Sequence, residues 1–258
     1  MSGHLTSHED GGTPTTPCGR KAIFDVARGL SVISMVLFHL CYDLRYLQGV
    51  PLGFFRPPLQ DVWRASTSWT FLFVAGCMCS FSRNGMRRAL RYALVAVTVF
   101  VATSIASVDT PISFGIMFCM AASTLVDELL GRLGLSPRGV PAAIALLCLF
   151  VVLLHLPQGT IGMGAARLGV PRVLYATPCL AFLGLPGPGF ASGDYYPLLP
   201  YCLMYLCGAA MGRSWEDHGH PRWFDAVSCR PLEGIGRHAL PIYLLHQPVI
   251  LGLLALVR

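Results

Sequence analysis

Charged residues are scarce in this chain. Only 12% of its 258 residues are Asp, Glu, Lys or Arg, against about 25% in soluble domains, and 54% are hydrophobic. This balance excludes a water-soluble globular domain and indicates a multi-pass membrane protein. The net charge of +6 could suggest nucleic acid, but the arginines cluster beside apolar stretches, as positive-inside topology requires. We therefore predict no nucleic-acid partner and membrane lipid as the surroundings.

The ten cysteines lack the spacing of a metal site or of a disulfide framework. There is no CxxC pair, and most of the cysteines lie inside apolar stretches. Cys77 and Cys79 are two residues apart without a matching histidine pair, and His218 and His220 are typical of a solvated loop. We predict free, mostly buried thiols and no metal ion.

The beginning of the chain lacks the apolar core of a cleavable signal peptide. Residues 1–19 are polar and rich in Gly, Pro and Thr, which predicts a disordered tail. The domain proper is expected over residues 20–258. Its first apolar span must itself direct the chain to the membrane.

The pattern of apolar stretches predicts an all-α, polytopic transmembrane helix bundle with about seven spans. The densest basic cluster, RNGMRRALR, begins at Arg83 and is expected in the cytoplasm, which puts the N-terminus on the same side because two spans precede it. Asp127 is expected in a later cytoplasmic connection. The predicted spans cover residues 22–47, 65–81, 91–108, 111–127, 140–156, 197–212 and 239–257.

Residues 157–196 differ from the rest because they are dense in Gly and Pro. Their apolar part, VLYATPCLAFLGL, is shorter than the roughly 20 residues that a span needs. We expect a re-entrant or interfacial segment, which is tolerated at depth only where it lines a cavity. The chain shows no internal repeat and no inverted pair of broken helices, which argues against a secondary transporter.

The first span, residues 22–47, carries four ionisable side chains. At about 100° per residue, Asp25, Arg28, His39 and Asp43 fall on one stripe, and His39 lies about 16 Å along the helix from Arg28. Ionisable groups at such depth usually face the bundle interior and serve function. The alternative is that Arg28 snorkels, Asp43 ends the helix in water, and His39 hydrogen-bonds another helix.

Four stretches in order resemble the heparan-alpha-glucosaminide N-acetyltransferase catalytic-domain family of transmembrane acyltransferases. The resemblance covers nearly all of residues 20–257 and implies transfer of an acetyl group from cytoplasmic acetyl-CoA to an amino or hydroxyl group of a sugar or glycoconjugate. The stretches are FDVARGLSVISMVLFHLCYDL from Phe24, FGIMFCMA at 114–121, DYYPLLPY at 194–201 and GRHALPIYLLHQPV at 236–249.

The sequence departs from this family at one point. In the lysosomal branch, the histidine proposed to take the acetyl group lies in the loop after the first helix, and residues 45–60 contain no histidine here. If the chemistry needs a histidine, it must be His39, whose spacing from Arg28 is similar to that in related O-acyltransferases, or His246. The acceptor therefore need not be a heparan-like sugar.

Acyl transfer from a thioester needs a base for the acceptor, or a nucleophile that carries the acyl group, together with a positive or hydrogen-bonding group for the oxyanion. His39 could fill either role, and Asp43, one turn away, could fix its tautomer. Direct transfer and an acetyl-imidazole intermediate both stay open. We take His39 and Asp43 as the catalytic candidates.

The other candidates are assigned to the two substrates. Arg28 and Arg237 are the candidates for binding acetyl-CoA, and Asp194, Tyr195 and His246 for the acceptor. Their structural alternatives are snorkelling for Arg28, turn capping for Asp194, and helix-end charge or packing for Arg237 and His246.

Two other kinds of function compete with a membrane acetyltransferase. The Arg–His–Asp stripe could relay protons or bind an anion in a transporter, or the chain could be a non-catalytic membrane scaffold. An enzyme should consume acetyl-CoA when an acceptor is supplied, whereas a transporter should move solute without cleaving any thioester. The sequence leaves homo-oligomer formation open.

Overall fold

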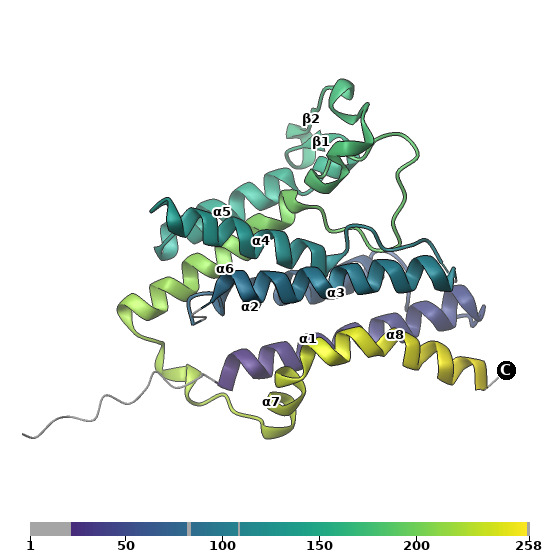
Figure 1. The fold of residues 1–258 in the computed structure, drawn as a ribbon, viewed down its shortest axis with the longest axis horizontal. Helices are drawn as coiled ribbons and strands as arrows, with labels where there is room; N and C mark the ends of the chain where they lie inside the picture. The colour runs from purple at the N-terminus through teal and green to yellow at the C-terminus, as the bar shows by residue number, and fades with distance from the viewer. Residues whose placement is uncertain (1–21, 82–83, 108, 257–258) are drawn as a thin grey trace, which may run out of the picture.

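The computed structural model describes residues 22–81, 84–107 and 109–256 (Figure 1). The predicted disordered tail, residues 1–19, lies outside this range. Within it the protein is an all-α helix bundle, as predicted, and its long helices run in alternating directions along the chain (Figure 1). These helices are α1 (Ala22–Tyr42), α2 (Leu59–Cys77), α3 (Gly85–Ala106), α4 (Ile116–Arg132), α5 (Gly139–Leu153), α6 (Leu198–His218) and α8 (Ala239–Leu256), with the short α7 (Arg230–Arg237) before α8.

Each of the seven predicted spans overlaps one of these long helices. Four stretches of the described chain are long and apolar enough to cross a membrane: Ala22–Leu47, Gly85–Ala106, Gly139–Gln158 and Ala239–Leu256. Large apolar side chains also stand exposed along α3 and α5, as lipid-facing helices require. The prediction of a polytopic all-α membrane protein is confirmed.

The expected place of Asp127 was wrong. It lies inside α4 rather than in a connection, because α4 begins and ends about five residues later than predicted. Its buried carboxylate accepts two hydrogen bonds, at 2.6 and 2.7 Å, from the guanidinium of Arg213 on α6. A carboxylate is tolerated between packed helices when an arginine pairs with it, whereas an unpaired buried charge would strongly destabilise the fold.

Glycines allow α2 and α6 to pack at close range. A side chain at Gly76 would collide with the backbone of Tyr205, and one at Gly208 would collide with the backbone of Phe73. Small residues at helix contacts are the usual means of bringing membrane helices together. This contact places the main apolar core between α2, α4 and α6.

The helix α1 forms a second layer with α7, α8 and α2 (Figure 1). The backbones of α1 and α7 touch at Gly29, which faces Leu232, and at Gly236, which faces Asp25. At its far end α1 widens into the π-helical turn η1 (Asp43–Leu47). Single π-helical turns of this kind are frequent at functional sites.

Residues between α5 and α6 form an irregular segment at one end of the bundle (Figure 1). It consists of a two-stranded antiparallel ribbon, β1 (Thr160–Ile161) and β2 (Leu168–Gly169), and of single 3₁₀ turns. The described segment holds no helix long enough to cross a membrane, in agreement with the sequence. The turns are η2 (Leu156–Gln158), η3 (Gly164–Ala166), η4 (Arg172–Tyr175) and η5 (Pro178–Leu183), and a further one, η6 (Arg222–Phe224), precedes α7.

Candidate active site

Two histidines face each other between α1 and α8. The ring centroids of His39 and His246 are 4.8 Å apart, and the rings are inclined at 61°. The contact forms because α8 packs against α1 in the second layer. The sequence named both residues but gave no reason to place them side by side.

Asp43 lies beyond this pair, at the start of the π-helical turn. Its side chain is buried, and its Oδ2 accepts a hydrogen bond of 2.9 Å from Nε2 of Gln247. Within the described chain no hydrogen bond joins Asp43 to His39, so the expected histidine–carboxylate contact is replaced by a contact to α8. The sequence analysis missed Gln247, although it is a polar residue next to His246 in an otherwise apolar helix.

The ring of His246 is held by its own helix. Its Nδ1 lies 2.6 Å from the carbonyl oxygen of Tyr243, and its Nε2 is buried without a hydrogen-bond partner among the described residues. The Tyr243 ring lies 5.8 Å from the imidazole. One nitrogen of this histidine is therefore engaged, and the other is free.

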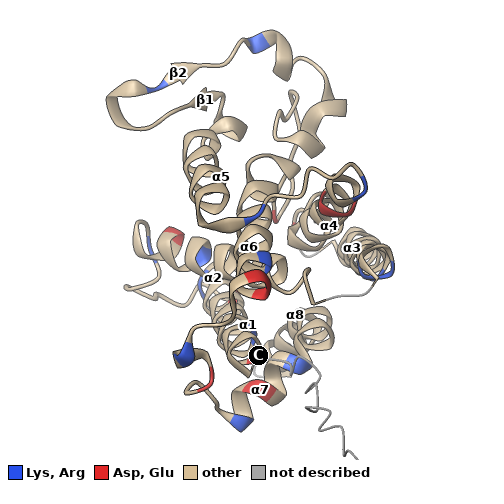
Figure 2. Ribbon diagram, turned by 90° about the vertical axis from the view of Figure 1, so that its left-hand side faces the viewer, with Lys and Arg blue, Asp and Glu red and all other residues tan. Residues whose placement is uncertain are grey.

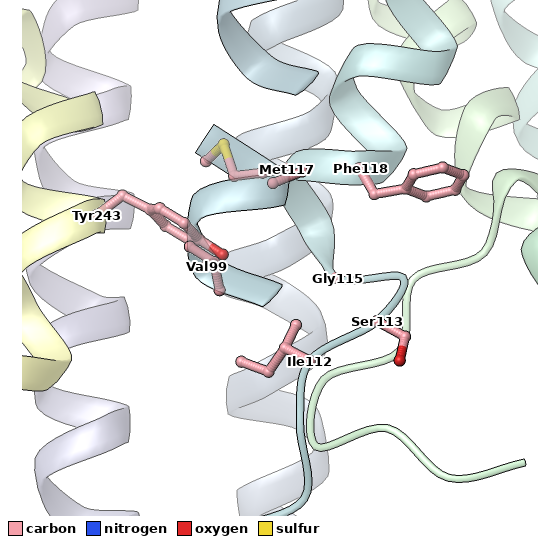
Figure 3. Close-up of a pocket in the computed structure, with 8 residues that line it drawn as sticks. Val99, Ile112, Ser113, Gly115, Met117, Phe118 and Tyr243 are labelled. Carbon is pink, nitrogen blue, oxygen red and sulfur yellow. The ribbon is translucent and has the colours of Figure 1, made fainter. Parts of the chain in front are cut away.

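Tyr243 connects the histidine pair with the beginning of α4. It is buried and reaches from α8 toward Gly115 and Met117 (Figure 3). The cavity at this point measures about 10 Å³, which is room for about one water molecule. Val99 and Ile112 complete its apolar wall (Figure 3). The sequence analysis had not singled out Tyr243.

Asp194 lies on the other side of Gly115. Its Oδ2 accepts a hydrogen bond of 3.4 Å from the backbone N–H of Ile116, the first residue of α4. Burial raises the pKa of this carboxyl to about 6, and the Ile116 N–H and the Arg64 guanidinium act in the opposite direction. The carboxylate also acts electrostatically on the Tyr243 hydroxyl. Asp194 thus accepts a hydrogen bond from the first turn of α4, and it lies in the same polar layer as Tyr243.

An outer groove of about 340 Å³ opens beside this layer. Tyr195 and Ser192 line it, together with Phe190 and residues of the irregular segment. The Tyr195 hydroxyl donates a hydrogen bond of 2.5 Å to the carbonyl of Ala181, so it points toward the irregular segment and away from the histidines. The candidate acceptor residues Asp194 and Tyr195 are therefore neighbours in sequence that face different spaces.

The two arginine candidates lie away from the histidine pair. Arg28 forms an ion pair with Asp25, keeps its buried Nε without a partner in the described part of the chain, and lies within electrostatic range of Tyr92 on α3. Arg237 is half exposed on α7, where it bonds the Glu233 carbonyl at 3.2 Å. Both residues belong to the end of the bundle where α7 meets α1.

Charged residues gather at one end of the bundle. Figure 2 looks onto the end of the bundle that carries α7 and shows basic and acidic residues there. The polar residues inside the described bundle include the histidine pair, Asp43 with Gln247, Asp194 beside Tyr243, and the ion pair of Asp127 with Arg213. The fold and this interior layer define a polytopic membrane protein with a buried polar site.

The comparisons with known proteins place the chain in a family. Residues 20–248 match the family model described as "Heparan-alpha-glucosaminide N-acetyltransferase, catalytic", and the protein belongs to this family. The resemblance seen in the sequence is confirmed. Searches of curated proteins and of solved structures gave no significant match. The family and the fold together make the protein a multi-pass membrane acyltransferase.

Proposed function

We propose that the protein transfers an acetyl group from cytoplasmic acetyl-CoA to an amino or hydroxyl group of a sugar or glycoconjugate. The observation that carries this proposal is the close contact of His39 with His246 inside the bundle. Imidazoles supply the proton transfers that acyl transfer needs. Buried polar residues in a membrane domain mark a functional site by default.

The donor enters from the end of the bundle that holds α7. Arg28 precedes His39 by eleven residues on α1, a rise of about 16 Å, so a long thioester arm that begins at Arg28 can reach the histidines. Guanidinium groups suit the phosphates of acetyl-CoA because they donate hydrogen bonds in a planar fork. Arg237 on the adjacent α7 is placed to extend the same basic surface. This assignment makes the arginine-rich end and the N-terminus cytoplasmic.

The acceptor approaches from the opposite end. The outer groove, with Tyr195 on its wall, is large enough for a sugar ring. Asp194 precedes Tyr195 of the groove wall, interacts electrostatically with Tyr243, and can accept a hydrogen bond from an amino or hydroxyl group. His246 then lies on the side of Tyr243 where the donor thioester arrives.

A reconstitution assay tests this function. Purified protein in liposomes should release free CoA thiol from acetyl-CoA only when an amino-sugar or hydroxyl acceptor is present, and mass spectrometry should find the acetylated acceptor. Inside-out vesicles should use added acetyl-CoA, whereas right-side-out vesicles should not. Solute uptake without thioester consumption would instead identify a transporter.

A further inference from the structure

We infer that His246, through Nε2, is the residue that takes the proton from the acceptor. This assignment rests on the proposed acetyl transfer and goes beyond it, because the activity alone does not say which imidazole acts. The evidence is that the two ring nitrogens of His246 differ: Nδ1 has a hydrogen-bond partner, and Nε2 has none among the described residues.

The hydrogen bond of Nδ1 fixes the tautomer. A backbone carbonyl oxygen can only accept, so the nitrogen 2.6 Å from the Tyr243 oxygen must carry a hydrogen. In a neutral imidazole the other nitrogen then bears a lone pair. The carbonyl of Tyr243 thereby prepares Nε2 as a proton acceptor.

The position of Nε2 suits this role. It is buried and has no hydrogen-bond partner in the described chain, which is costly for a polar atom unless a ligand supplies the partner. His39 faces the same imidazole across the helix contact, and the Tyr243 ring lies beside it, within electrostatic range of Asp194. A hydroxyl or amino group of the acceptor, held at Asp194, is the donor that Nε2 lacks.

The chemical step balances with His246 alone as the proton carrier. The acceptor nitrogen or oxygen forms a bond to the acetyl carbon of the thioester, and the bond from this carbon to sulfur breaks. The proton of the acceptor goes to Nε2 of His246 and from there to the leaving sulfur, which gives free CoA thiol and restores the neutral imidazole. Neutral His39 lies against this imidazole and stabilises its charged form while it holds the proton.

Asparagine at position 246 tests the inference. Its amide can replace Nδ1 as a donor to the Tyr243 carbonyl, but it has no atom that corresponds to Nε2. We expect His246→Asn to fold, to bind acetyl-CoA, and to lose about 10²–10⁴-fold in turnover. The matched control is His218→Asn at the exposed end of α6, where Nδ1 makes the same kind of contact with the Ser214 carbonyl at 3.0 Å; it should keep full turnover.

Nitrogen NMR of histidine-labelled wild-type protein gives a readout that does not depend on activity. The His246 signals, assigned by their loss in His246→Asn or in His246→Gln, should show a hydrogen on Nδ1 and none on Nε2. A hydrogen on Nε2, or full turnover in a folded His246→Asn protein, would overturn the inference while leaving the acetyltransferase function intact. A wild-type protein that transfers no acetyl group to any acceptor would refute the function and the role of His246 together.

Discussion

Gln247 donates a 2.9 Å hydrogen bond to Asp43, a residue 204 positions earlier in the chain. This bond ties the far end of α1 to α8 just beyond the histidine pair. The Asp43 residue is only 1% exposed, so water cannot replace the lost donor if the bond is broken. The alignment of His39 with His246 therefore depends on a contact that holds the two helices in register.

Removal of the donor should show this dependence. Gln247→Leu leaves Asp43 buried without its amide partner and should lower the free energy of unfolding by about 1.5–3 kcal/mol. Asp43→Asn should cost less, because an amide oxygen still accepts from Gln247, and should reduce turnover less than a change at His39. Denaturant unfolding of the two single variants measures both losses of stability. A Gln247→Leu protein as stable as wild type would mean that the bond contributes nothing.

His39 should be needed for turnover more than for binding. His39→Ala removes an imidazole that acts in the transition state, so turnover should fall about 10²–10⁴-fold while acetyl-CoA affinity changes little. Single-turnover kinetics and isothermal titration with CoA separate the two effects. A variant in which stability and all ligand affinities fall together would show that His39 serves packing.

Helical periodicity explains how much of the site the sequence could predict. It placed Asp25, Arg28, His39 and Asp43 on one stripe of α1 because residues on one helix share a face in a fixed rotation. It could not say which helix that stripe meets. The contacts of His39 with His246 and of Asp43 with Gln247 exist only because α8 returns to α1 at the end of the chain.

Irregular backbone limited the prediction at the acceptor side. Asp194 and Tyr195 are adjacent in a segment without a repeating direction, and the structure turns the first toward α4 and the second toward Ala181. Tyr243 was missed because an aromatic residue in an apolar helix is usually a packing residue. Only its contacts with His246 and Asp194 distinguish Tyr243 from an ordinary packing residue.

The contact of α7 with α1 offers a matched pair of glycine substitutions. A Cβ at Gly236 would collide with the Asp25 backbone, whereas a Cβ at Gly234, in the same helix, meets nothing within 4 Å. Gly236→Ala should therefore destabilise the protein by about 1–3 kcal/mol, as overpacking does. Gly234→Ala should be neutral or stabilise by about 0.5–1 kcal/mol through helix propensity. Thermal unfolding in detergent compares the two, and equal effects would contradict the close packing.

Arg28 should act in donor binding. Arg28→Ala should weaken CoA binding by about 1.5–3 kcal/mol, the range for a lost charge-assisted hydrogen bond. Arg28→Lys should recover part of the affinity, since an ammonium cannot form a bidentate fork. Arg132→Ala, which removes an exposed arginine paired with Glu128 at 3.7 Å, is the control. Unchanged affinity in a folded Arg28→Ala protein would assign this arginine to anchoring.

Asp194 should make stability depend on pH. Burial raises its pKa from 3.8 to about 6 in the folded protein, so between these values the folded state binds a proton that the unfolded chain does not. The contribution of this group to stability is present in full below pH 3.8 and is lost as the pH rises through about 6.

Asparagine at position 194 cannot titrate but can still accept the hydrogen bond from Ile116. The melting temperature of Asp194→Asn relative to wild type should therefore be higher at about pH 7.5 than at about pH 4.5. Asp217→Asn, at the other end of α6, controls for the loss of a carboxylate as such. A difference between Asp194→Asn and wild type that does not change with pH would show that the carboxyl at 194 is not buried as described.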